Sequence, residues 1–161
     1  MLKTMPDHQV SLRVAAPGDI PALFSIRTAV RENHLDLARL AERGVTPASV
    51  ATMLDEREAR TWVVEEGDEV VAFSMANAHT GSVFAVFVRA EAEGRGYGRA
   101  ILTAAEEWLF AAGWDTIWLE TGQEPHFRAH RLYQAAGWKL IGPVDHDDVR
   151  YEKRRPVGSH T

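Results

Sequence analysis

The chain contains no cysteine among its 161 residues. It therefore has no disulfide, no thiolate ligand for a metal ion and no cysteine nucleophile. Any group that the protein transfers must reach its acceptor without a cysteinyl intermediate. Direct attack by the acceptor is the expected route.

Long apolar runs are also missing. No stretch approaches the length of a membrane-spanning helix, and the start of the chain, residues 1–6, lacks the apolar core of a secretion signal. We therefore expect a cytoplasmic protein that has no membrane partner.

An excess of positive charge is absent, since the formal net charge is -5 and the isoelectric point is near 5.8. This balance disfavours a nucleic-acid partner but is compatible with a basic substrate. With 45% hydrophobic and 25% charged residues, the length suits one globular domain over residues 1–161, with a core from about residue 9 to about residue 153.

Three features follow one another between residues 82 and 108: an apolar run at 83–88, a glycine-rich turn at 93–98 and a helical pattern. The run has β-branched and aromatic residues without alternation, which predicts a strand covered on both faces at the centre of a sheet. Helix-spaced apolar residues come next and end at a glycine. They are Ile101, Ala105, Trp108 and Ala112, followed by Gly113.

The glycine-rich turn is suited to binding an anion. The first turn of a helix leaves backbone N–H groups unpaired and carries the positive end of the helix dipole. Gly94, Gly96 and Gly98 lack side chains that would keep a phosphate away, and Arg95 and Arg99 add positive charge. The turn therefore predicts a phosphorylated cofactor.

Spacing narrows the choice of cofactor. A dinucleotide fingerprint needs a third glycine where this chain has Arg99 or Ile101, and no Gly-Lys pair occurs that could form a nucleoside triphosphate loop. A flexible turn that binds nothing remains the alternative.

The loop resembles that of the GNAT superfamily of acyl-CoA-dependent N-acetyltransferases, whose signature is Gln/Arg-x-x-Gly-x-Gly/Ala after the central strand. The corresponding residues here are Glu93, Gly96 and Gly98, and Glu93 departs from the signature by removing a hydrogen-bond donor. The resemblance implies that acetyl-CoA is the acyl donor. It also implies that the loop from Gly94 to Arg99, with Tyr97 in it, holds the pyrophosphate.

A second stretch supports the same resemblance. Residues 129–138 are similar to the family pattern Ala-x-x-Leu-Tyr-x-x-x-Gly-Phe, with Trp138 in the last position. The resemblance implies that Tyr133 donates a hydrogen bond to the departing coenzyme A sulfur. The alternative is that Tyr133 is a core aromatic residue, because it lies at helical spacing with Ala129 and Leu132.

The rest of the chain predicts further strands and helices. Strands are expected at Val10–Val14, Thr61–Glu65, Val70–Met75, Ile117–Glu120, Trp138–Ile141 and Val149–Tyr151. Helices are expected after Asp19 as a cap, from Pro47, and from Pro125 to Ala136, with disorder from Arg154 onward. The resemblance implies an α/β fold with a mixed sheet of about seven mostly antiparallel strands, a parallel central pair and about four helices.

The resemblance also implies further cofactor contacts. The backbone of Val86, Phe87 and Val88 would pair with the pantetheine arm, and an N–H group there would donate to the developing oxyanion. His126 stands near the position of a family asparagine and would contact the cofactor. Its spacing with His130 can also hold a metal, but the third ligand is missing, so no metal is expected.

An acceptor amine must lose a proton before it attacks. Glu120 is the first candidate base, because it ends the strand beside the expected cofactor gap. Glu32 and His34, with Asn33 between them, come second, since the family's acceptor site is walled by this segment. A surface position or a chain of water molecules is the alternative for each.

We therefore predict an N-acetyltransferase that passes the acetyl group of acetyl-CoA directly to a primary amine of a small molecule or peptide in a ternary complex. The alternative is a catalytically inactive CoA-binding sensor or interaction module. Edge strands and exposed tryptophans would support a homodimer.

Overall fold

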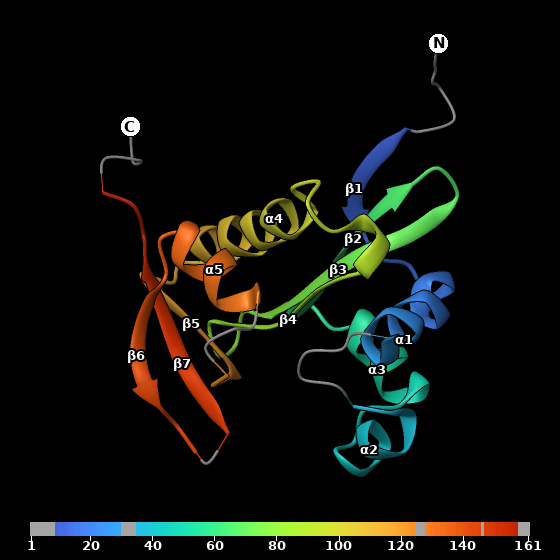
Figure 1. Cartoon of the computed structure of the whole chain (residues 1–161), viewed down its shortest axis with the longest axis horizontal. Helices are drawn as coiled ribbons and strands as arrows, with labels where there is room; N and C mark the ends of the chain where they lie inside the picture. The colour runs from blue at the N-terminus through green and yellow to red at the C-terminus, as the bar shows by residue number, and fades with distance from the viewer. Residues whose placement is uncertain (1–8, 30–34, 125–127, 146, 158–161) are drawn as a thin grey trace.

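The computed structural model describes residues 9–29, 35–124, 128–145 and 147–157. These residues form seven strands and five α-helices, one helix more than expected (Figure 1). The helices are α1 (Ile20–Ala29), α2 (Leu37–Glu42), α3 (Pro47–Leu54), α4 (Tyr97–Ala111) and α5 (Arg128–Ala135). The strands are β1 (Val10–Val14), β2 (Ala59–Glu66), β3 (Glu69–Asn77), β4 (Ser82–Val88), β5 (Thr116–Gly122), β6 (Lys139–Pro143) and β7 (Asp148–Arg154).

The strands form one sheet in the order β1-β2-β3-β4-β5-β7-β6, which confirms that β4 lies at its centre. Among the described residues, β4 and β5 are the one parallel pair, and all other neighbouring strands are antiparallel. Helix α4 connects β4 with β5, as a parallel connection requires. The predicted mixed sheet with a parallel central pair is therefore confirmed.

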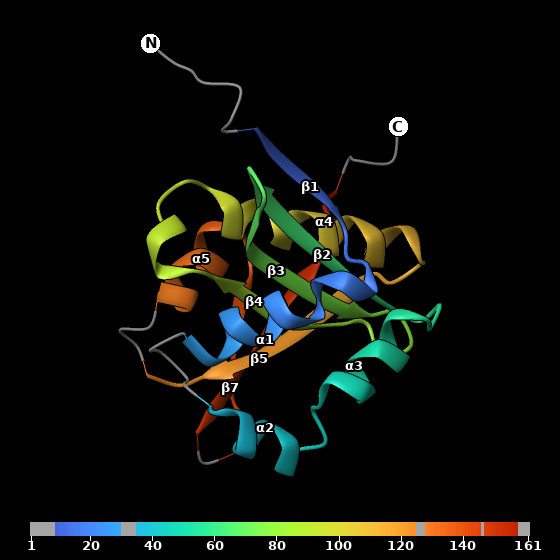
Figure 2. The same cartoon turned by 90° about the vertical axis from the view of Figure 1, so that its right-hand side faces the viewer.

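Helices cover the two faces of the sheet separately (Figure 1, Figure 2). Leu102 and Leu109 of α4 share a buried cluster with Leu119 of β5, and α5 packs beside them. On the other face, Ile26 of α1 is buried with Phe73 of β3. Each such side chain contributes about 1.5–3 kcal/mol by leaving water. Within the described residues, no helix has the length and apolar character that a membrane crossing requires.

Strands β4 and β5 separate almost as soon as they meet. Their ladder consists of the single pair Ser82 and Trp118, and a bulge opposite β3 leaves Phe84 without a partner on that strand. Phe84 is 45% exposed, and residues 85–88 are half-buried. The prediction that β4 is covered on both faces holds in part. Val86 and Val88 pack on the side of α4, and Ala85 and Phe87 pack on the side of α1, but Phe84 is exposed and the edge of the strand borders an opening in the sheet.

The buried face of α4 also differs from the predicted stripe. Ile101, Leu102, Ala105 and Leu109 are buried, whereas Ala112 is exposed. Glu106 lies among them and accepts hydrogen bonds from Trp138 Nε1 at 2.7 Å and Lys153 Nζ at 2.8 Å. A carboxylate is stable at a buried position when a cation and a donor satisfy it. Trp138 lies just before β6 and Lys153 lies on β7. Helical spacing within α4 therefore could not reveal these partners.

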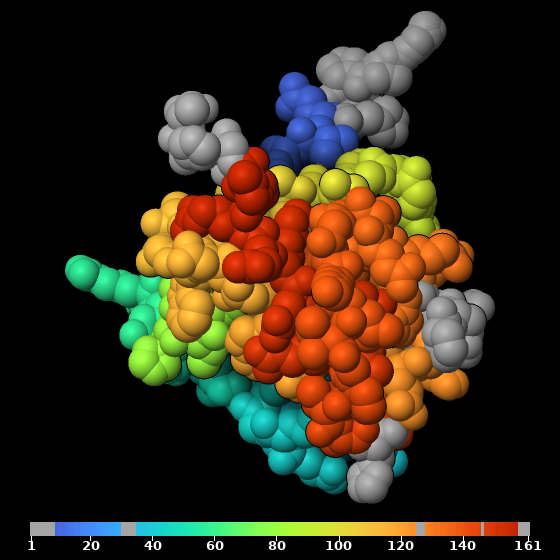
Figure 3. All heavy atoms as spheres, turned by 90° about the vertical axis from the view of Figure 1, so that its left-hand side faces the viewer, coloured from blue at the N-terminus to red at the C-terminus, as the bar shows by residue number. Residues whose placement is uncertain are grey.

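Two expectations about the surface need correction. The backbone does not lose order at Arg154, because Arg155 Nη2 donates to the carbonyl oxygens of Phe110 and Trp114 at 2.8 Å each. None of the five tryptophans is fully exposed, so they give no support to a homodimer. The edge strands β1 and β6 remain, and β6 lies with β7 and α5 on the face that Figure 3 shows. The homodimer stays a prediction.

The prediction that Asp19 caps the following helix is also wrong. Asp19 ends a short 3-10 turn, Pro17–Asp19, and its carboxylate faces backward along the chain. It accepts hydrogen bonds from Arg13 Nη1 at 2.8 Å, from Arg13 Nη2 at 3.0 Å and from the Ala16 N–H group at 2.7 Å. The hydrogen bonds from Arg13 hold the pKa of Asp19 below its ordinary value.

Replacing Asp19 with asparagine should lower the free energy of unfolding at pH 7 by about 1–3 kcal/mol, because the buried carboxylate that accepts the charge-assisted hydrogen bonds of Arg13 is lost. A lowered folded-state pKa stabilises the protein above the unfolded-state value of about 3.9, and this contribution disappears as the pH falls through the folded-state pKa. Urea unfolding of both proteins across acidic and neutral pH should therefore show two converging curves. A deficit that stays constant at the lowest pH where both fold would contradict this account. Asp115→Asn is the control, because that side chain is 91% exposed.

Candidate functional site

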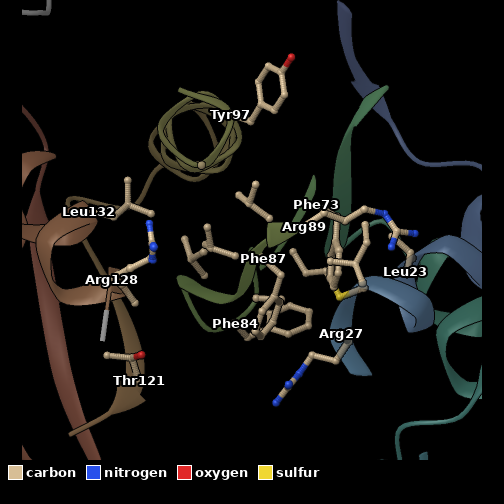
Figure 4. Close-up of a pocket in the computed structure, with 18 of the residues that line it drawn as sticks. Leu23, Arg27, Phe73, Phe84, Phe87, Arg89, Tyr97, Thr121, Arg128 and Leu132 are labelled. Carbon is tan, nitrogen blue, oxygen red and sulfur yellow. The ribbon is translucent and has the colours of Figure 1, made fainter. Parts of the chain in front are cut away.

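A cavity of about 1350 Å³ crosses the molecule where β4 and β5 separate. Its lining comes from both faces of the sheet: α1, α2 and α3 on one side, and the start of α4 with α5 on the other. Figure 4 shows β4 between Arg27 and Leu23 of α1 on one side and Leu132 and Arg128 of α5 on the other. The unpaired edge of β4 therefore faces an open space.

The glycine-rich loop forms one end of this cavity. Gly94 and Gly96 have φ angles of +81° and +84°, which side-chain-bearing residues rarely adopt. The first hydrogen bond of α4 runs from the Ala100 N–H group to the Gly96 carbonyl oxygen, so the N–H groups of the first turn have no helical acceptor. Gly98 packs close to Leu132, whose methyl carbon lies 3.5 Å from where a Cβ would stand. This geometry suits a phosphate.

The two arginines of the loop are placed differently. Arg95 Nη1 donates to both carboxylate oxygens of Glu66 at 2.6 and 2.7 Å, and Tyr97 donates to the same carboxylate. Arg95 does not line the cavity. Its positive charge is paired with Glu66 of β2 instead. Arg99 lines the cavity and donates to the Ala135 carbonyl oxygen at 3.3 Å.

A further arginine stands near the loop. Arg128, at the start of α5, lines the cavity and lies 3.3 Å from the carboxylate of Glu93. This ion pair offsets the negative charge that Glu93 brings to the phosphate site. Sequence reasoning missed Arg128, because 34 residues separate it from Gly94 and only the fold brings them together.

Tyr133 belongs both to the core and to the lining of the cavity. It is 5% exposed and packs against Trp138 and Tyr151, with ring centroids 6.2 and 5.5 Å away. It also lines the cavity, and within the described part of the chain its hydroxyl has no hydrogen-bond partner. Burial raises the pKa of Tyr133 well above its ordinary value. The phenol therefore keeps its proton and can donate a hydrogen bond into the cavity.

Two carboxylates line the cavity on the face of the sheet opposite α5. Glu120 is exposed on β5, and Asp148 of β7 lies opposite Gly122 of that strand. Burial raises the pKa of Asp148, and the charges of Asp145 and Asp147 raise it further. Sequence reasoning missed Asp148, because only the pairing of β5 with β7 brings it near Glu120.

Of the remaining predicted residues, one is described by the structure and four are not. His130 is buried, and both ring nitrogens are engaged, Nδ1 with the Tyr151 hydroxyl and Nε2 with the Gly122 carbonyl oxygen, at 2.8 Å each. It anchors α5 to the sheet. The other predicted residues lie outside the described part of the chain: Glu32, Asn33, His34 and His126.

Solved structures share this fold. PaiA N-acetyltransferase from Thermoplasma acidophilum, in complex with coenzyme A, aligns with a TM-score of 0.78 and 12% identity over 91% of this chain and 99% of that one. The structure of yncA from Salmonella typhimurium, with its cofactor acetyl-CoA, aligns with a TM-score of 0.70 and 16% identity over 93% and 96% of the two chains.

Sequence comparison agrees. Mycothiol acetyltransferase of Stackebrandtia nassauensis is 28% identical over 92% of this chain, which spans only 49% of that relative's length. The family model for the acetyltransferase (GNAT) family matches residues 26–138. Because this match covers more than half of the chain and includes both the glycine loop and α5, the protein belongs to the GNAT acetyltransferase family.

Proposed function

We propose that the protein transfers an acetyl group from acetyl-CoA to a primary amine. The observation that carries this proposal is the glycine loop, which opens onto a cavity that crosses the sheet between β4 and β5. Structural neighbours in complex with coenzyme A or acetyl-CoA support the choice of cofactor. The acceptor differs among relatives, whose names include a mycothiol acetyltransferase and a ribosomal-protein-S18-alanine N-acetyltransferase.

The residues present fit coenzyme A. The first-turn N–H groups of α4 would hold the pyrophosphate, with no side chain on Gly94 or Gly96 to obstruct it. Arg99 and Arg128 would add positive charge from α4 and α5. When bound, acetyl-CoA supplies the activated acetyl group as a thioester.

Groups of the protein on both faces of the sheet would then take part in the reaction. Backbone N–H groups of Val86 and Val88, which alternate away from β3 toward the unpaired edge of β4, would stabilise negative charge on the thioester oxygen. Tyr133 would donate a hydrogen bond to the sulfur as the C–S bond breaks. Glu120, on the opposite face, would accept the proton that the amine loses as the new C–N bond forms.

The alternative of a binding module without catalysis is less well supported. A module of that kind needs the loop but has no use for a buried phenol without a hydrogen-bond partner in the described residues, or for two carboxylates on the opposite wall. Tyr133, Glu120 and Asp148 are the groups that an acyl transfer requires in addition to cofactor binding.

Replacing Gly98 with glutamate should abolish acetyl-CoA binding, since a carboxylate would enter the phosphate site. Gly98→Ala is the matched control, because a Cβ there meets Leu132 and Val88 at 3.5 Å, an ordinary contact. Isothermal titration with acetyl-CoA should give a dissociation constant for the alanine variant within about threefold of the parent, a change below about 1 kcal/mol. Equal affinity of the glutamate variant would contradict the cofactor site.

Replacing Tyr133 with phenylalanine should lower kcat by about 10- to 100-fold, because the sulfur loses its donor. Acetyl-CoA affinity and thermal stability should stay unchanged, since no hydrogen bond within the described residues is lost. The comparison is Tyr151→Phe, which loses the contact with His130 and should lower the melting temperature instead. A Tyr133→Phe enzyme with full turnover would remove Tyr133 from the mechanism.

Replacing Glu120 with glutamine should lower kcat/KM for an alkylamine such as 2-phenylethylamine by about 10- to 100-fold at pH 7. The loss should shrink as the pH approaches the amine pKa of about 10, because the neutral amine needs no base. A pH profile of thiol release measures this. A deficit that is the same at every pH contradicts the role of a base, and Asp148→Asn in parallel shows whether that carboxylate carries the role instead.

A further inference from the structure

The cavity has a charge balance opposite to that of the whole chain. Among the described residues, six arginines and four carboxylates line it, although the protein carries a net charge of -5. Arg99 and Arg128 stand near the phosphate loop, where coenzyme A accounts for them. Arg27 and Arg43 come from α1 and from the end of α2, on the side of the cavity that faces away from the phosphate site.

Arg27 is built into the wall of the cavity. Its guanidinium carbon lies 4.5 Å from the ring centroid of Phe87, and Figure 4 shows the side chain extending from α1 beneath the rings of Phe84 and Phe87. Burial lowers the pKa of Arg27, and the nearby charge of Arg43 lowers it further. Arg27 and Arg43 therefore bring two positive charges to the same part of the cavity.

Two carboxylates of the lining come from the sheet, Glu120 from β5 and Asp148 from β7. Arg43 lies near enough to Asp148 for its charge to lower the pKa of that carboxyl, so both signs of charge meet in this part of the cavity. Apolar side chains line the same space, among them Phe24, Leu40, Met53, Phe84 and Phe87.

Resting on the proposed function, we propose that the acceptor is an amino-acid-like zwitterion that bears an apolar side chain. Arg27 and Arg43 bind its carboxylate, and Glu120 with Asp148 faces its amine. The apolar side chain packs between Phe84 and the helices α1–α3. A polyamine lacks the carboxylate, and a peptide N-terminus lacks it beside the amine, so both fit this arrangement less well.

Three probes separate these features: L-phenylalanine, L-phenylalaninamide and 2-phenylethylamine. Calorimetric titration of each into the protein saturated with coenzyme A measures binding without turnover, and thiol release from acetyl-CoA measures turnover. We expect L-phenylalanine to bind about 10- to 100-fold more tightly than either analogue, the range expected for charge-assisted hydrogen bonds.

The variants Arg43→Gln and Arg27→Gln test the residues. Each should remove most of the preference for L-phenylalanine, while the affinity for 2-phenylethylamine and for acetyl-CoA stays constant. Arg43 is exposed, so its variant keeps the test valid if loss of Arg27 perturbs folding. Arg39→Gln is the matched control, because Arg39 is exposed on α2 but outside the cavity lining.

The outcomes distinguish the two proposals. Acetylation of 2-phenylethylamine as efficiently as of L-phenylalanine, unchanged by Arg43→Gln, overturns the zwitterion inference and leaves the acetyltransferase intact. Selective binding of L-phenylalanine that depends on Arg43, without thiol release, supports the acceptor site and contradicts the transfer reaction. Failure to bind acetyl-CoA or any of the three probes overturns both.

Discussion

The separation of β4 from β5 is the constraint on which the rest of the site depends. A parallel pair in the middle of a sheet would normally continue its ladder, but here one residue pair is formed before the strands diverge. The backbone edge of β4 is left without a strand to bond with, which costs free energy unless another group takes those hydrogen bonds. The same divergence opens the cavity and half-exposes residues that the apolar pattern would place in the core.

Charged residues then determine which end of the cavity suits an anion. The loop combines left-handed glycines with a helix start, and Arg128 offsets the unusual Glu93. Arg95, the most obvious cation in the loop sequence, pairs instead with Glu66 on β2 and fastens the loop to the sheet. The cofactor site that we propose therefore depends more on backbone N–H groups than the two arginines of the loop sequence suggest.

The two faces of the sheet hold groups of different chemical character. Tyr133 lies on the α5 side, buried with Trp138 and Tyr151, where desolvation keeps the phenol protonated. Glu120 and Asp148 lie on the other face, where an amine can approach. The hydrogen-bond donor and the proton acceptors that we propose for the reaction therefore lie on opposite faces of the sheet.

The sequence by itself determined the glycine loop, the order of strands and helices, the central position of β4 and the placement of Tyr133 in a family motif. These features follow from local spacing and from backbone conformations that only glycine adopts readily. The tertiary structure alone decided which charges meet: Arg95 with Glu66, Arg128 with Glu93, and Arg43 with Arg27 and Asp148. The reason is that each of these pairs joins elements distant in the chain, so the pairing depends on strand order and on the divergence of β4 from β5, which no local pattern encodes.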